Sequence, residues 1–166
     1  QSSISLMVMT PDRWQSCVLE KTTISDLLAY WEHQGQGPSL DKYIASDVSN
    51  IDSEGRLQLL PGSIDLSYIE RHIDGVGRPN ILKATTELTA YCRDKFDFTL
   101  VDCQPSVTYL TELWLQLSDY HLVPCRCDFP SFNGIQIVDK VIHRMIKTPG
   151  FAGEMSRRLG VLLNMK

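Results

Sequence analysis

The sequence lacks the features that mark several classes of protein. Its five cysteines, at positions 17, 92, 103, 125 and 127, form no C-x-x-C pair, which argues against a disulfide scaffold or a structural zinc site. No apolar run approaches the roughly 18 residues of a membrane span, and no signal peptide is visible. There is no G-x-S-x-G sequence, and the histidines do not pair at metal-ligand spacing. We therefore expect reduced thiols in a cytoplasm, without a hydrolase triad.

Both ends of the sequence look cut. The chain has no initiator methionine, starts in the polar run Gln1-Ser2-Ser3 and stops in the apolar run Leu159–Met165. We therefore expect an internal piece of a longer protein. The 166 residues are enough for one domain with a sizeable core. The net charge of −4 argues against wholesale electrostatic coating of nucleic acid.

Apolar, partly β-branched runs alternate along the chain with stretches of helical spacing. The apolar runs are Leu57–Pro61, Phe98–Asp102, Tyr120–Pro124 and Leu159–Asn164. Continuous apolar runs are typical of strands buried on both faces of a parallel sheet. The helical stretches are Ile24–Trp31 (with Thr22 or Thr23 as N-cap), Ile81–Lys95, Tyr109–Leu117 and Ser131–Lys147. This alternation predicts an α/β fold built from βαβ units with right-handed crossovers.

The strongest chemical signal is an acid at the end of one apolar run. Phe98–Asp102 predicts a buried parallel strand that delivers Asp102 to its carboxyl end. In open α/β sheets, ligands bind outside the carboxyl ends of the strands. An aspartate there can hold Mg²⁺, usually through water, next to nucleotide phosphates. The alternative is an acid that merely caps the helix from Thr108 onward, and this segment alone leaves both open.

Five segments, in their order and spacing, resemble the ParA/MinD family of deviant Walker-type ATPases, which partition plasmids and chromosomes. They are Leu57–Pro61 (LQLLP), Phe96–Ser106 (FDFTLVDCQPS), Leu117–Pro124 (LSDYHLVP), Asp128–Gly134 (DFPSFNG) and Leu159–Met165 (LGVLLNM). The resemblance implies a single nucleotide-binding domain over residues 1–166. Its fold would be of the P-loop NTPase type, with a mostly parallel sheet flanked by helices, incomplete at both ends.

The resemblance also implies roles for residues of a nucleotide site. Asp102 would be the Walker B-like acid near Mg²⁺. Pro105 and Ser106 would lie in the switch loop that senses the γ-phosphate, and Gln1 would sit at the edge of the first switch. Gln104 stands where the family commonly has proline, which weakens claims about the geometry of this switch.

Two further positions would belong to the base side of that site. Asn164 would lie near the adenine, because its amide can both donate and accept at a base edge. Pro124 follows the third predicted strand and could help to shape the base pocket. The phosphate-cradling loop of such enzymes, G-x-x-x-x-G-K-[ST] in general form, occurs nowhere in these residues. The resemblance therefore covers nearly the whole chain but only part of a site.

The implied function is that of an ATPase that binds Mg-ATP, dimerises around the nucleotide and uses hydrolysis as a DNA-binding switch in partitioning. The implied partners are ATP, a second copy of the protein, a DNA-bound ParB-like adaptor and nonspecific DNA. We expect the isolated 166 residues not to hydrolyse ATP. The alternatives are a MinD-like regulator, a polysaccharide-synthesis accessory ATPase, or a degenerate ATPase-fold protein that only binds partners.

Basic residues recur on one side of the last predicted helix. Lys140, Arg144 and Lys147 fall at i, i+4 and i+7. A solvated helix face is the favoured interpretation. The sharper hypothesis is a surface for DNA phosphates or an acidic partner, whose affinity would fall steeply with added salt.

Overall fold

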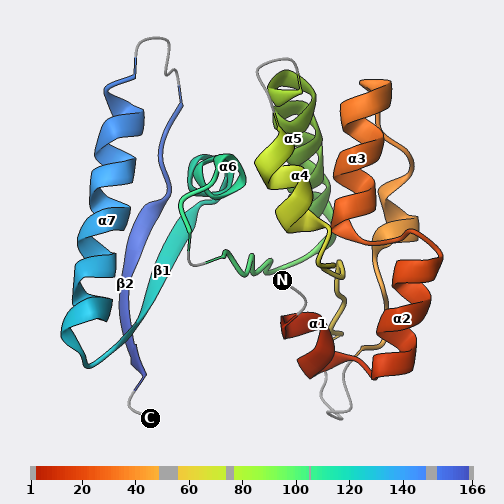
Figure 1. The fold of residues 1–166 in the computed structure, drawn as a ribbon, viewed down its shortest axis with the longest axis horizontal. Helices are drawn as coiled ribbons and strands as arrows, with labels where there is room; N and C mark the ends of the chain where they lie inside the picture. Colours follow the sequence, from red (N-terminus) through yellow and green to blue (C-terminus); the bar gives the residue numbers. More distant parts are fainter. Residues whose placement is uncertain (1–2, 49–55, 74–76, 105, 149–152, 165–166) are drawn as a thin grey trace. The chain divides into compact units, whose positions relative to one another are not determined.

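The computed structural model describes residues 3–48, 56–73, 77–104, 106–148 and 153–164. Its elements, in chain order, are α1 (Ser3–Val8), α2 (Pro11–Leu19), α3 (Ile24–Gln34), the 3₁₀ helix η1 (Leu40–Tyr43), α4 (Leu66–His72), α5 (Arg78–Lys95), α6 (Tyr109–Leu117), β1 (Tyr120–Arg126), α7 (Phe129–Ile146) and β2 (Arg157–Asn164) (Figure 1). The chain divides into two compact units, Gln1–Asp102 and Cys103–Lys166. Each unit is described by itself.

The core of the N-terminal unit lies between α3 and α5, which pack side by side (Figure 1). Both helices bury residues at helical spacing. Their buried apolar side chains are Leu27, Leu28 and Trp31 in α3 and Ile81, Ala84 and Leu88 in α5. This recurrence at three- and four-residue intervals is the pattern of a helix with one face turned to a core.

Local capping fixes both ends of α3. The Thr23 hydroxyl accepts a hydrogen bond from the Asp26 backbone N–H at 3.4 Å, and the Asp26 carboxylate accepts one from the Thr23 N–H at 3.1 Å. This reciprocal capping box confirms Thr23 as the N-cap. Gly35 ends the helix with φ +65°, a conformation that favours glycine. The helix runs three residues beyond the predicted Trp31 because this stop signal comes later.

The predicted parallel strand at Leu57–Pro61 is wrong. The segment is extended, but its ladder contact is an isolated antiparallel bridge from Leu59 to Ala45. Beyond that bridge, the Pro61 carbonyl accepts a hydrogen bond from the Ile24 N–H at 2.9 Å. The Gly62 carbonyl accepts one from Trp14 Nε1, also at 2.9 Å. A helix start and a side chain thus take up two carbonyls that would otherwise need a neighbouring strand.

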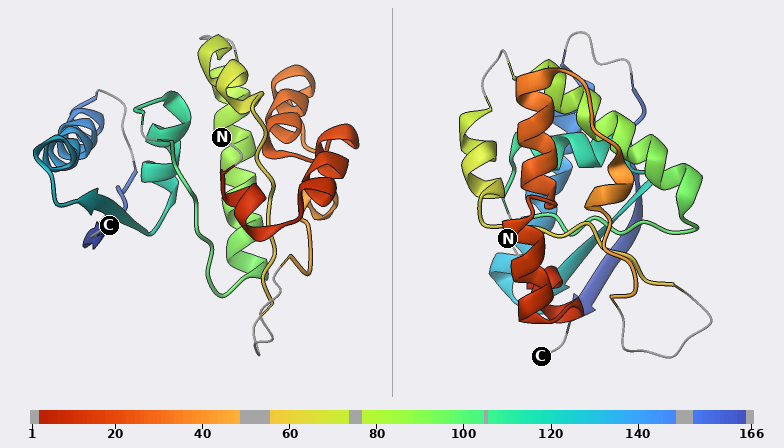
Figure 2. Two further views of the ribbon diagram at one scale, coloured as in Figure 1. Left: turned by 60° about the horizontal axis from the view of Figure 1, so that its bottom comes forward. Right: turned by 90° about the vertical axis from the view of Figure 1, so that its right-hand side faces the viewer.

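The C-terminal unit contains a parallel pair of strands with α6 and α7. β1 and β2 pair from Tyr120↔Arg157 to Arg126↔Asn164, and α7 runs alongside the strands (Figure 2). These elements confirm the strands predicted at Tyr120–Pro124 and Leu159–Asn164. They also confirm the two helices predicted in this half of the chain, α6 with its predicted bounds. The result is an α/β arrangement in which helices cover one face of a two-stranded parallel sheet.

A bulge interrupts the strand pairing near its start. The register passes from His121↔Arg158 to Leu122↔Gly160, so it skips Leu159. Gly160 takes a φ of +155°, which side chains with a Cβ rarely adopt. One extra residue in one strand of a pair defines a β-bulge, which is rare between parallel strands.

The two faces of this sheet differ in exposure. Along β1, the side chains of His121, Val123 and Cys125 are less exposed than their neighbours, and Cys125 is buried. This is the face that the helices cover. The alternate side chains at positions 120, 122, 124 and 126 are exposed. We call the face that carries them the open face.

The predicted strand at Phe98–Asp102 is also wrong. Within the described parts of the chain this segment joins no ladder, and the side chains of Phe98 and Leu100 are 92% and 95% exposed. An apolar strand forms only where neighbouring strands take up its backbone groups and other layers cover its faces. Here β1 pairs with β2, and no described segment of the N-terminal unit offers a ladder to Phe98–Asp102.

Within the described ranges, none of the helices combines the length and the apolar character that a bilayer span requires.

Candidate functional site

The carboxyl ends of β1 and β2 form the candidate site. Arg126 and Asn164 are the last registered pair, and Pro124 pairs with Leu162 two residues earlier. Paired residues on neighbouring strands project to the same face, so Pro124, Arg126 and Asn164 share the open face. All three side chains are exposed. The structure therefore brings together Pro124 and Asn164, the two residues assigned from sequence to the base side of a nucleotide site.

An ion pair and a helix start border this end of the sheet. Arg126 Nε lies 3.4 Å from Asp128 Oδ2, and Asp128 Oδ1 accepts a hydrogen bond from the Ser131 N–H at 2.9 Å, which caps α7. The hydrogen bonds from Ser131, together with the Arg126 charge, hold the pKa of Asp128 below its usual value. The edge of the site thus carries a carboxylate and a guanidinium that compensate each other.

Sequence reasoning missed Arg126, because in this part of the chain it considered only the cysteines at positions 125 and 127. The available signal was the alternation of Leu122, Pro124 and Arg126, which continues two residues beyond the predicted strand. Cys125 is buried and Cys127 is exposed. Over the described ranges, no three His, Cys, Asp or Glu side chains gather in a way that could hold a metal ion.

The structure does not assign the remaining predicted site residues to this end of the sheet. Asp102 is exposed and ends the N-terminal unit, whereas Ser106, Pro124 and Asn164 belong to the C-terminal unit. The Ser106 carbonyl accepts from Thr111 Oγ1 at 3.0 Å, at the start of α6. Gln1 and Pro105 lie outside the described residues. The placement of these residues around a nucleotide stays a prediction.

The alternative role of Asp102 as a helix cap is wrong. Thr108 is the N-cap of α6, and its hydroxyl accepts a hydrogen bond from the Thr111 N–H at 3.3 Å. The start of α6 therefore has its own capping side chain six residues after Asp102. The exposed carboxylate of Asp102 is left without that structural role.

Comparison with known proteins places the chain in a family. The profile of the AAA domain family matches residues 16–152, which is most of the chain. The chain belongs to the ParA/MinD-like family of P-loop ATPases. No solved structure matches this ParA/MinD-like chain.

Its curated relatives are longer proteins. The chromosome partitioning protein ParA of Caulobacter vibrioides is 24% identical over 148 residues, which cover 87% of this chain and 49% of ParA. The chromosome-partitioning ATPase Soj of Treponema pallidum is 30% identical over 87 residues, or 52% of this chain and 33% of Soj. An uncharacterized protein of Mycobacterium tuberculosis is 36% identical over 110 residues, or 63% of this chain and 32% of that protein. The chain therefore spans between about a third and about half the length of these relatives.

The basic side of α7 is partly neutralised in this ParA/MinD-like chain. Arg144 makes an ion pair with Glu112 of α6, and Arg158 of β2 makes one with Asp139 of α7. Lys140 and Lys147 are exposed. A cavity of ≈ 420 Å³ is lined by Asp139, Lys140, His143 and Arg144. Acids from neighbouring positions thus reduce the positive field that the sequence spacing suggested.

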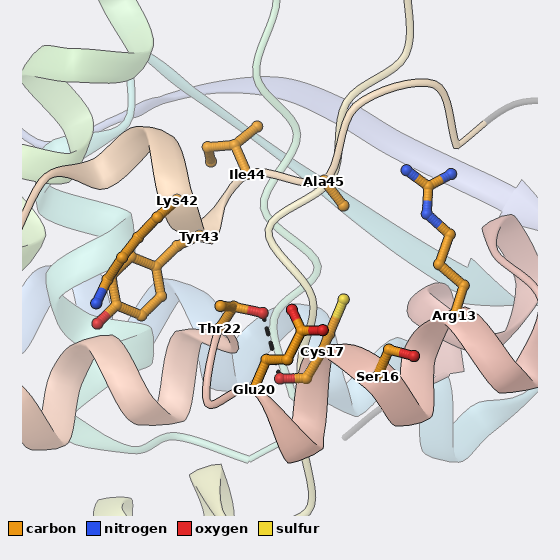
Figure 3. A pocket seen from close by; sticks show the side chains of 9 residues that line it. All are labelled: Arg13, Ser16, Cys17, Glu20, Thr22, Lys42, Tyr43, Ile44 and Ala45. Atoms are coloured by element: carbon orange, nitrogen blue, oxygen red, sulfur yellow. Dashed lines mark hydrogen bonds between the residues drawn. The ribbon is translucent and has the colours of Figure 1, made fainter.

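A second cavity lies in the N-terminal unit, between α2 and the segment that begins with η1 (Figure 3). It measures ≈ 240 Å³ and is lined by Arg13, Ser16, Cys17, Glu20, Thr22, Lys42, Tyr43, Ile44 and Ala45. Arg13 donates hydrogen bonds to the backbone carbonyls of Ser46 and Asp47, the latter at 2.8 Å. The guanidinium is therefore held by the backbone of the segment that follows η1. None of the predicted site residues lines this cavity.

His121 is a half-buried titratable group on the covered face of the sheet. Its Nδ1 lies 3.0 Å from Ser156 Oγ, while Nε2 is buried without a hydrogen-bond partner among the described residues. Burial, reinforced by the positive charge of Arg158, lowers the pKa of His121 below its usual value, against a smaller raising effect of the Ser156 contact. Neutral imidazole is therefore the form that this fold favours.

We expect the stability of the C-terminal unit to fall as the pH drops. A histidine whose pKa is lower in the folded state than in the unfolded state binds its proton first on unfolding. The free energy of unfolding therefore decreases as the pH falls below about 6.5. From pH 7.5 to pH 5.5, the midpoint temperature of thermal unfolding should fall further for wild type than for His121→Leu. His143→Leu, at an exposed position of α7, is the matched control and should keep the wild-type dependence. An undiminished pH dependence in His121→Leu would contradict the assignment.

Proposed function

We propose that the chain is part of a partitioning ATPase that binds Mg-ATP at the carboxyl ends of its parallel strands. The observation that carries the proposal is the convergence of Pro124 and Asn164 at those ends, in a chain whose family match spans residues 16–152. Open α/β sheets bind ligands at this position. The names of the relatives, a chromosome partitioning protein and a chromosome-partitioning ATPase, support partitioning as the process.

The reaction is the attack of water on the γ-phosphate. Catalysis of this kind consists mainly of positioning and electrostatic stabilisation, with little covalent chemistry for the protein. In the proposed site, Asp102 would hold Mg²⁺ through water. Pro105 and Ser106 belong to the switch loop that senses the γ-phosphate, and Gln1 to the edge of the first switch. Pro124 and Asn164 contact the adenine. Mg²⁺ supplies the charge that stabilises the phosphate oxygens during transfer.

Nucleotide binding is proposed to control assembly. The ATP-bound protein forms a homodimer, and a DNA-bound ParB-like adaptor stimulates hydrolysis and resets it. Lys140, Arg144 and Lys147 supply a nonspecific contact to DNA. Because Arg144 is already paired with Glu112, the contact rests mainly on the two lysines and is sensitive to salt.

ATP turnover by the full-length natural protein tests the proposal. We expect Mg²⁺-dependent phosphate release from that protein and none from the isolated 166 residues. The reason is that the residues of this chain include no Walker-type lysine loop to stabilise the transferred charge. Parallel assays with EDTA serve as the blank for both proteins. ATP turnover by the isolated chain would contradict the proposal that these 166 residues hold only part of the site. Absence of nucleotide binding by the full-length protein would favour the degenerate, partner-binding alternative.

A further inference from the structure

Arg126 occupies a position that suits contact with a bound nucleotide. It lies opposite Asn164 in the last registered pair of β1 and β2 and on the open face next to Pro124. Its side chain is 72% exposed. A planar, exposed guanidinium at the carboxyl end of parallel strands lies where α/β sheets receive their ligands.

The charge of Arg126 is already compensated. Asp128 Oδ2 lies 3.4 Å from Arg126 Nε, and the hydrogen bonds that Asp128 receives at the start of α7 keep that carboxylate ionised. A paired guanidinium has a weaker field for a phosphate than an unpaired one. Its two flat faces remain available, and arginine stacks on planar π-systems through them. The arrangement therefore suits a base better than a phosphate.

The surroundings of Arg126 suit a base as well. Pro124 and Leu162 form the pair directly before it on the same face and offer an apolar floor. The Asn164 amide presents a donor and an acceptor side by side, which is what the edge of a nucleobase requires. Sites for small ligands commonly combine an apolar floor with a few convergent polar groups.

We propose that Arg126 stacks on the base of the bound nucleotide, next to Asn164 at the base edge, and that this stacking makes the site prefer purines to pyrimidines. The inference rests on the proposed function, since it names a residue and a preference within that nucleotide site. A purine offers the guanidinium a larger face than a pyrimidine, and stacking strength differs with the base in the same way.

Calorimetric titrations of the full-length natural protein with Mg-ATP and Mg-CTP test this assignment. Arg126→Lys keeps the positive charge but loses the planar face. We expect it to bind ATP about tenfold more weakly than wild type and to bind CTP with a smaller loss. Arg157→Lys, at the amino end of β2 and exposed, is the matched control and should bind both nucleotides like wild type. Far-ultraviolet circular dichroism verifies that both variants fold.

The possible failures can be told apart. An equal loss for ATP and CTP in Arg126→Lys would overturn stacking in favour of a phosphate contact. Unchanged binding of both nucleotides would remove Arg126 from the site, while wild-type binding of ATP would leave the proposed function standing. If the wild-type protein binds neither nucleotide, the proposed function fails and this inference fails with it.

Discussion

The Asp102→Asn variant of the full-length natural protein is expected to lose ATP turnover by about 100-fold or more, a typical effect of removing one electrostatic contact from a transition state. The substitution keeps the size of the side chain but removes the negative charge that the proposed water-mediated Mg²⁺ contact requires. Asp102 is exposed and lies in an irregular segment. Stability should therefore be unchanged, since surface substitutions outside special features usually have small effects. Steady-state phosphate release at saturating Mg-ATP measures the loss.

Asp97 provides the matched control for this experiment. It is an exposed aspartate in the same irregular segment, five residues before Asp102, and the proposal gives it no role. Asp97→Asn should therefore retain wild-type turnover. If both variants lose activity equally, the effect belongs to the segment as a whole, and the assignment of Asp102 to Mg²⁺ is wrong. Unimpaired turnover in Asp102→Asn would have the same consequence.

The Trp31→Ala variant is expected to lower the free energy of unfolding of the N-terminal unit by about 3–5 kcal/mol, the usual range for truncating a buried aromatic side chain. The Trp31 side chain of α3 is 1% exposed and belongs to the core between α3 and α5. Lys83 Nζ lies 5.3 Å from the centroid of its ring. Removing the indole leaves a cavity that the packed helices cannot close. Urea denaturation followed by circular dichroism measures the change.

Two further substitutions separate packing from polarity at this position. The indole Nε1 is buried without a hydrogen-bond partner within the described residues, and a phenylalanine would remove that donor while filling much of the space. Trp31→Phe should therefore cost less than about 2 kcal/mol, since leaving a buried donor unsatisfied is itself unfavourable. Tyr30→Ala, at the neighbouring position with 42% exposure, should have a small effect. A Tyr30→Ala loss as large as that of Trp31→Ala would contradict the proposed core.

Helix positions could be predicted from sequence because their signals are local. Thr23 and Gly35 mark the two ends of α3 through hydrogen bonds to residues three or four positions away. The same is true of the start of α6, where Thr108 acts on Thr111. Capping chemistry of this kind is written in a few consecutive residues and does not depend on the rest of the fold.

Strand positions could be predicted only where the pairing partner also lies in the same unit. The run at Tyr120–Pro124 becomes β1 because β2 pairs with it. The run at Phe98–Asp102 is equally apolar but joins no ladder in the described ranges. Periodicity reports that a segment is suited to burial, whereas the choice of partner depends on contacts distant in sequence. Pro124 and Asn164, which the family resemblance assigned to the base side of the site, share the open face because β1 and β2 pair. The place of Asp102 in that site stays a prediction.

The bulge near the start of β2 sets the pairing register of every later residue in that strand. If Leu159 paired with Leu122 instead of being skipped, each later residue of β2 would move forward by one position along β1. Leu163 would then lie opposite Arg126, and Asn164 would pass beyond the end of the ladder. A one-residue slip also exchanges the two faces of a strand. Gly160, four residues before Asn164, therefore decides whether the side chain opposite Arg126 is that of Leu163 or that of Asn164. The backbone of Gly160 accommodates the extra residue.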